Sequence, residues 1–180
     1  ILNTRNEKTD DLMAELVNID LENISEIINI QGPRYVGHLN GNIEVVDFMN
    51  HPLVNASIYT NDFLRINQDT VGTVKANVQY DVDRKLLKIN PGTSITRNES
   101  HGTIEGFVNA NDSTIHIATD VQQLSISFIN QFLSDYIQNI RGYASGNVNV
   151  DGSLSNPGVS GKIDLNDASL KVLFLGTTYF

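Results

Sequence analysis

Cysteine and tryptophan are both absent from this chain of 180 residues, and only four prolines occur in it. Without cysteine, the chain cannot form disulfide frameworks, zinc sites with thiolate ligands or cysteine nucleophiles. Long apolar runs are missing as well, because no stretch approaches the roughly 20 residues of a membrane-spanning helix. Disulfide scaffolds and thiol enzymes are therefore excluded by composition alone.

Positive charge is scarce. Twelve Lys and Arg residues stand against 21 Asp and Glu, which gives a formal net charge of -9. A domain this acidic is repelled by phosphate backbones and by anionic lipid headgroups. We therefore expect no nucleic-acid partner, and any contact with lipid must use apolar surface rather than a basic patch.

Motifs that carry catalysis or bind metals are also missing. His38, His51, His101 and His116 show neither the H-x-x-x-H nor the H-E-x-x-H spacing, and no G-x-S-x-G, P-loop or G-x-G-x-x-G motif occurs. The segments NANDS and NVNVDGS lack the closing glutamate of a calcium loop. We predict that the chain is not an enzyme, with no catalytic residue, no metal site and no cofactor.

The sequence is rich in alternating apolar and polar residues, the pattern of half-buried strands. In the longest such run, Val74, Ala76, Val78, Tyr80 and Val82 share one face. Residues that suit tight turns separate these runs. The predicted turns are Asn61–Asp62, Asp83–Lys85, Asn90–Gly92, Asn111–Asp112, Ser155–Gly158 and Asn166–Asp167. Many strands at roughly ten-residue spacing predict an antiparallel meander.

Two segments follow a helical period instead. Apolar residues recur at steps of three and four from Ile129 to Ile140, which predicts an amphipathic helix of about four turns that ends at Gly142. A shorter helix is predicted from Leu21 to Ile28, before Gly32 and Pro33. Two short helices cannot cover the apolar side of so many strands.

The chain also repeats itself at an offset of 105 residues. Equivalent pairs are Gly41 and Gly146, Ile43 and Val148, Val45 and Val150, Pro52 and Pro157, and Ile58 and Ile163. Such self-similarity is typical of repeat architectures. The final residues, LKVLFLGTTYF, are strand-like and the first residue is Ile1. We predict one segment, residues 1–180, of a larger repeat protein, with degenerate repeats at about 21–66 and 126–172.

A sheet with one apolar face must cover that face. It can close on itself as a barrel, pack as a sandwich, or fold over incompletely and leave an apolar trough. A trough of this size marks a binding surface, which acyl chains could fill.

The second copy of the repeat resembles a known family. From Gly142 to Val172 the chain reads GYASGNVNVDGSLSNPGVSGKIDLNDASLKV, and LGTTY follows from Leu175 to Tyr179. This stretch resembles the large envelope proteins of the TamB type and, more distantly, AsmA-like proteins. In that pattern a helix leads into G-x-[apolar]-x-[apolar]-x-G-[ST]-[apolar]-x-N-P, and then into G-x-[apolar]-x-[apolar] and a short turn. Residues 37–66 match as a degenerate copy, in which Asn50–Pro52 replaces the Asn-Pro step.

The resemblance implies a protein that is anchored in the inner membrane of Gram-negative bacteria and extends across the periplasm. Its repeating sheet would fold like a taco shell around a continuous hydrophobic groove. It would carry phospholipid between the inner and outer membranes. It would also assist outer-membrane biogenesis, with an Omp85-type outer-membrane protein as a partner of the full-length chain.

We therefore predict a mostly β fold, an antiparallel meander curled into an open, taco-like or half-barrel sheet with an apolar groove, plus one or two short amphipathic helices. The predicted function is that of a non-enzymatic periplasmic bridge-like module that binds and conducts lipid acyl chains. The residues predicted to line the groove are Ile43, Val45, Val54, Ile58, Val74, Val78, Ile115, Ile117, Val148, Val150, Ile163 and Leu165. The alternative is a structural or adhesive β-sandwich module of a surface protein, and a carbohydrate-active β-helix enzyme ranks last.

Overall fold

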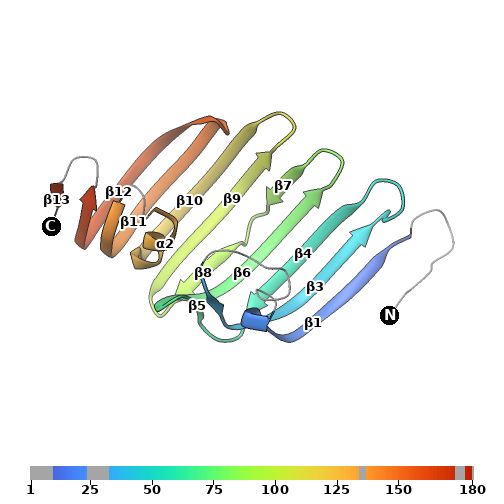
Figure 1. Cartoon of the computed structure of the whole chain (residues 1–180), viewed down its shortest axis with the longest axis horizontal. Coiled ribbons are helices and arrows are strands. Elements are labelled where there is room, and N and C mark those ends of the chain that lie inside the picture. The colour runs from blue at the N-terminus through green and yellow to red at the C-terminus, as the bar shows by residue number, and fades with distance from the viewer. Residues whose placement is uncertain (1–9, 24–32, 134–136, 173–176, 180) are drawn as a thin grey trace.

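The computed structural model describes residues 10–23, 33–133, 137–172 and 177–179. In this part of the chain, thirteen strands form one sheet in the order β1-β3-β4-β6-β7-β9-β10-β11-β12-β13, with β2, β5 and β8 beside that path. The strands are β1 (Leu12–Asp20), β2 (Tyr35–Val36), β3 (His38–Val46), β4 (Leu53–Thr60), β5 (Leu64–Ile66), β6 (Asp69–Asp81), β7 (Leu86–Ile89), β8 (Ser94–Arg97), β9 (Ser100–Asn109), β10 (Thr114–Ser125), β11 (Ile137–Ser153), β12 (Asn156–Val172) and β13 (Thr177–Tyr179). Figure 1 shows the long strands side by side in a single row.

Neighbouring strands are antiparallel, as a meander requires. β7 and β8 lie in line between β6 and β9, with the predicted turn Asn90–Gly92 between them. The predicted turns Asn61–Asp62, Asp83–Lys85 and Asn111–Asp112 connect successive strands in the same way. The turn predicted at Ser155–Gly158 was placed too late, because Leu154 and Ser155 form it and Asn156 to Gly158 already pair with β11. The last predicted turn was Asn166–Asp167. That prediction was wrong, because β12 continues through both residues to Val172.

Bulges bend the longer strands near one end. The register of β1, β10, β11 and β12 shifts where residues with positive φ stand in the strand. These residues are Asn18 (φ 52°), Gln123 (46°), Asn139 (57°) and Asp167 (49°). A bulge inserts an extra residue and increases the local twist, so the sheet curls where bulges lie next to each other. Asp167 therefore serves a bulge rather than the turn that its sequence predicted.

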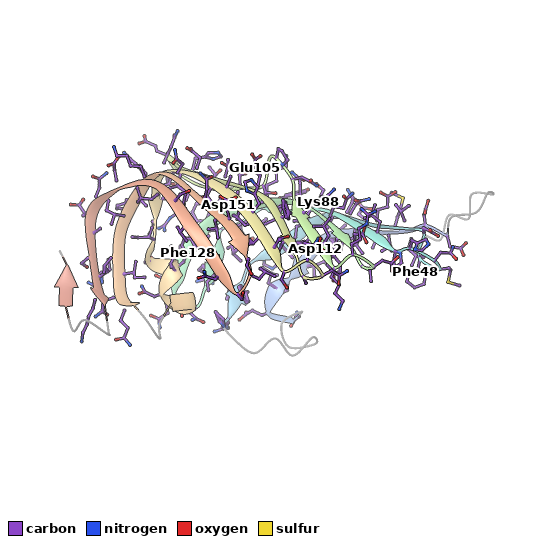
Figure 2. All side chains as sticks on the ribbon, turned by 90° about the horizontal axis from the view of Figure 1, so that it is seen from above. Phe48, Lys88, Glu105, Asp112, Phe128 and Asp151 are labelled. Carbon is purple, nitrogen blue, oxygen red and sulfur yellow. The ribbon has the colours of Figure 1, made fainter. Side chains whose placement is uncertain are left out.

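The sheet is curled but open. Figure 2, seen from above relative to Figure 1, shows it as an arch, and the end strands β1 and β13 of the described chain do not pair with one another. The buried apolar residues are Ile66, Val71, Leu124, Ile140 and Ala144, and no large side chain of the described residues is fully buried. The predicted fold class, a mostly β, open curled sheet, is confirmed.

The long helix predicted from Ile129 to Ile140 was wrong. Among the described residues of this stretch, only a 3₁₀ turn, η1 (Ser127–Ile129), and one helical turn, α2 (Asn130–Leu133), form. From Ile137 the backbone already belongs to β11 and pairs with β12, so sheet pairing overrides the helical period. Of the shorter predicted helix, residues 21–23 are helical and the remainder lies outside the described residues.

Candidate functional site

The candidate site is the concave face of the sheet, where the strand register aligns apolar residues in rows. One row crosses nine strands through directly paired residues. Its members are Ala14, Ile43, Ala56, Val78, Ile89, Gly106, Ile117, Val150 and Val159. Since side chains alternate between faces along each strand, paired residues of a row share a face. The row therefore forms a continuous apolar stripe across the sheet.

A second row runs parallel to the first, two residues further along each strand. It consists of Leu12, Val45, Val54, Tyr80, Leu87, Val108, Ile115, Gly152 and Pro157. On the opposite side of the first row, shorter rows run through Ile58 and Ala76 and through Ile104, Thr119 and Val148. The apolar stripe is thus several residues wide. We name this concave surface the apolar groove.

All twelve residues predicted from the sequence to line a groove lie on this face. Six of them lie on β3, β4 and β6, and the other six lie on β10, β11 and β12. They are spread across the sheet rather than gathered at one point. Their contact with lipid stays a prediction.

The groove deepens at one place into a cavity of about 440 Å³. Val148, Ile163 and Leu165 of the predicted residues line it. Its other lining residues are Ile95, Gly102, Thr103, Ile104, Thr119, Val121, Leu124, Ile126, Phe128, Ile129 and Ala144. The cavity thus lies against β8 to β12, with η1 contributing to its wall.

Sequence reasoning missed the wall that η1 contributes. Leu124, Ile126 and Phe128 alternate with period two, one residue out of phase with Ile117 because of the bulge at Gln123, and this signal was available. The helix predicted to begin at Ile129, directly after this stretch, concealed it. Phe128 points into the concave side of the arch, whereas Glu105 and Asp151 lie on the outer side (Figure 2).

The outer face of the sheet is polar. Glu44, Asn55, Gln79 and Lys88 follow one another in a single row of paired residues across β3, β4, β6 and β7. The Gln79 side-chain amide donates a hydrogen bond to the Asn55 side-chain oxygen at 2.9 Å. The sheet therefore has one face suited to water and one suited to apolar matter.

The apolar groove is uncovered along β12. Val159 is 70% exposed, Leu165 48% and Ile163 36%, although all three point to the concave side. Each exposed apolar surface costs free energy in water, at about 25 cal/mol per Å². An apolar ligand that covered these side chains would recover that free energy.

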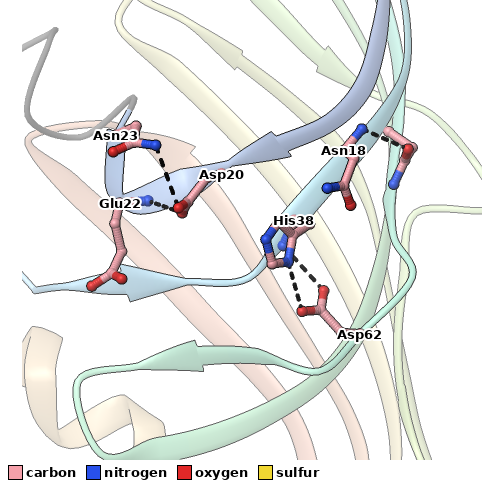
Figure 3. Close-up of polar contacts among 7 residues, drawn as sticks. Asn18, Asp20, Glu22, Asn23, His38 and Asp62 are labelled. Carbon is pink, nitrogen blue, oxygen red and sulfur yellow. Dashed lines mark hydrogen bonds and ion pairs between the residues drawn. The ribbon is translucent and has the colours of Figure 1, made fainter.

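Three of the histidines pair with aspartates on the outside of the sheet. The His38 Nδ1 lies 3.0 Å from an Asp62 carboxylate oxygen (Figure 3), the His51 Nδ1 lies 2.7 Å from Asp83, and His116 contacts Asp151. Asp62 also accepts a hydrogen bond from the His38 backbone amide at 3.0 Å. The described residues contain no group of three or more His, Cys, Asp or Glu side chains that could hold a metal ion. These pairs connect neighbouring loops and strand ends.

The His38–Asp62 contact predicts a pH dependence. The hydrogen bond to Asp62 raises the pKa of His38 above its usual 6.5, and the bonds from His38 lower the pKa of Asp62 below its usual 3.8. The His38 contribution to stability is therefore complete below pH 6.5 and is lost as pH rises through the raised value, while the Asp62 contribution is lost in acid. Between these limits both contributions are present.

Replacing Asp62 with asparagine should return the pKa of His38 toward 6.5, measured by NMR titration of the ring. His51 serves as the internal control, because its pKa is raised by its hydrogen bond to Asp83 and this contact is untouched. An unchanged His38 titration in Asp62→Asn would contradict the assignment.

The comparisons with known proteins fit this geometry. Residues 92–179 match the family model of the TamB C-terminal domain. The comparisons with curated proteins and with solved structures found no match. TamB is a family of envelope proteins with a role in assembly and is not a family of enzymes. None of the described helices is long and apolar enough to cross a membrane. Residues 92–179 are therefore similar to the TamB C-terminal domain, which is consistent with a fragment of the TamB type.

Proposed function

We propose that the apolar groove binds phospholipid acyl chains and conducts them between the inner and outer membranes, as a periplasmic module of an inner-membrane-anchored protein that assists outer-membrane biogenesis. The observation that carries this proposal is the unbroken apolar row from Ala14 on β1 to Val159 on β12. A row that crosses the whole sheet provides a path rather than a single pocket.

The mechanism would be passive. Acyl chains lie along the apolar rows, where each buried methylene gains about 0.8 kcal/mol, while the headgroups stay in water at the open side of the arch. Neighbouring positions on the path offer similar side chains, so a chain can move along it without crossing a polar barrier. No catalytic group is needed for such movement.

The net charge of the chain sets a condition on lipid binding. The net charge of -9 repels anionic headgroups at long range, so binding depends on apolar contact and on salt screening. An Omp85-type outer-membrane protein remains the proposed partner of the full-length chain. The sandwich alternative needs a second sheet against the concave face, whereas all described strands belong to one sheet.

The proposal is tested by asking whether the purified chain carries lipid. We expect native mass spectrometry after mild extraction from a Gram-negative host to show phospholipid bound to the chain. After delipidation, the chain should take up a fluorescent phospholipid from phosphatidylcholine vesicles. A spectrum of lipid-free protein together with no uptake from vesicles would rule the proposal out.

A further inference from the structure

The segment Ser127–Leu133, which comprises η1 and α2, lies over the concave face rather than in the sheet. Figure 1 places α2 beside β10 and β11 at one end of these strands. Phe128 and Ile129 line the same cavity as Val148 and Leu165 of β11 and β12. This segment, which we name the cover, therefore forms a wall of the cavity that is not part of the sheet.

One side of the cover is fixed to β11 by Asn130. The Asn130 side-chain amide donates to the Ile140 carbonyl oxygen at 2.7 Å, and its side-chain oxygen accepts from the Ile140 backbone amide at 2.8 Å. The same amide group donates to the Ser127 carbonyl oxygen at 2.8 Å. A bidentate amide contact of this kind holds the cover against β11 in one orientation.

On its other side, the cover is attached through Gln131. The Asn67 side-chain amide donates to the Gln131 side-chain oxygen at 2.5 Å, and the Gln131 amide donates to an Asp69 carboxylate oxygen at 3.3 Å. These partners lie 64 and 62 residues away, Asn67 in the turn between β5 and β6 and Asp69 at the start of β6. The contact therefore joins two parts of the chain that no strand pairing connects at this point.

The β5–β6 turn is itself held in place. The Asn67 backbone amide donates to the Arg34 carbonyl oxygen at 2.7 Å, and the Arg34 amide donates to the Asn67 side-chain oxygen at 2.8 Å. Gln131 thus binds to a turn that its own hydrogen bonds hold in place. Its bond to Asn67 is exposed to solvent, and exposed hydrogen bonds contribute little net stability because water competes for both groups.

We propose that the cover is a clamp on the acyl site, hinged at Asn130 and latched by Gln131 to Asn67 and Asp69. This inference rests on the proposed function, since it concerns how the same groove retains and releases an acyl chain. With the latch closed, Phe128 holds the chain against Val148. With the latch open, the cover lifts from the β5–β6 turn while Asn130 keeps its base on β11.

A reversible cross-link tests the clamp. The chain contains no cysteine, so Asn67→Cys with Gln131→Cys provides two unique thiols that a short bismethanethiosulfonate reagent can join. We expect exchange of a fluorescent phospholipid with phosphatidylcholine vesicles to slow at least about tenfold when the thiols are joined, and to recover on reduction. The reduced protein is the matched control for folding.

A single substitution tests the latch from the opposite direction. Gln131→Ala should speed lipid exchange by about threefold to tenfold, because both latch bonds are lost. Gln122→Ala, on the exposed part of β10, is the control and should leave exchange unchanged. Equal exchange rates in the joined and reduced proteins, with lipid bound in each, would overturn the clamp and show that chains pass along the open side at β12. Failure of the wild-type chain to bind any lipid would instead overturn the proposed function, and the clamp with it.

Discussion

Replacing Gly146 with alanine is expected to lower the free energy of unfolding by about 3 kcal/mol, because the backbone there excludes any side chain. Gly146 has φ of 133°, a conformation that L residues rarely adopt. A Cβ at this position would lie 2.1 Å from the Lys162 carbonyl oxygen on β12, well inside van der Waals contact. Guanidinium unfolding followed by circular dichroism measures the loss.

Gly158, on the neighbouring strand of the same hairpin, is the matched control. Its φ is not in the positive region, and the nearest atom to an added Cβ is the Asp151 carbonyl oxygen at 3.4 Å, an ordinary contact. Gly158→Ala should therefore change stability by less than about 0.5 kcal/mol. Equal effects of the two substitutions would show that the close approach of β11 and β12 at Gly146 is not a constraint on the fold.

The same close approach occurs in the first half of the chain. Gly41 on β3 has φ of 141°, and a Cβ there would lie 2.1 Å from the Ser57 carbonyl oxygen. Gly41 pairs with Ile58, and Gly146 pairs with Ile163, which are equivalent residues under the 105-residue offset. The two hairpins thus share their register as well as their residues. That residues 21–66 and 126–172 are repeats of a larger protein stays a prediction.

Most of what could be predicted of the fold followed from the alternation of apolar and polar residues with period two. In a meander, each strand pairs with its sequence neighbour, so residues that share a face in one strand meet residues of the same face in the next. Val78 and Ile117 could therefore be assigned to one surface without knowledge of the exact register. Because the two predicted helices could not cover the apolar side of the sheet, an open face was one of three options, and the TamB resemblance selected it.

The predictions that failed depended on local signals that have two structural uses. Asn166–Asp167 tolerates positive φ, which suits a bulge as well as a turn, and only the pairing of β12 with β11 decides between them. The stretch from Ile129 to Ile140 contains helical spacing, but its second half gains more from pairing with β12. Long-range pairing of this kind cannot be inferred from local spacing.

The polar contacts of the cover could not be predicted from the sequence, for another reason. Asn67, Asn130 and Gln131 are amide residues in an amide-rich chain, and nothing near them in the sequence distinguishes them. Asn67 and Gln131 matter through a contact between residues more than 60 positions apart. The apolar groove was predictable because each strand repeats the same pattern, whereas a latch made of single side chains has no pattern.

The second large effect is expected from a charge in the groove. Val148→Asp places a carboxylate in the wall of the cavity, between Thr119 on β10 and Gly161 on β12. An acyl chain that covered this carboxylate would remove it from water without a partner, which costs several kcal/mol unless the group takes up a proton. Phospholipid affinity should therefore fall by at least about 100-fold at neutral pH, measured by titration with a fluorescent phospholipid.

Asn147→Asp is the matched control for this substitution. Asn147 is the preceding residue of β11, and it lies on the outer face opposite Asp120 and Lys162. The substitution Asn147→Asp adds the same charge to the same strand as Val148→Asp does. Any long-range repulsion of lipid is therefore equal in the two variants, and only the position of the carboxylate differs. Because Val148 is only half-buried, the Val148→Asp protein should remain folded in circular dichroism, and its lipid binding should partly return in acid as the carboxylate takes up a proton. If both variants bound lipid as the wild type does, acyl chains would not lie against Val148, and the apolar groove would not be the path of the lipid.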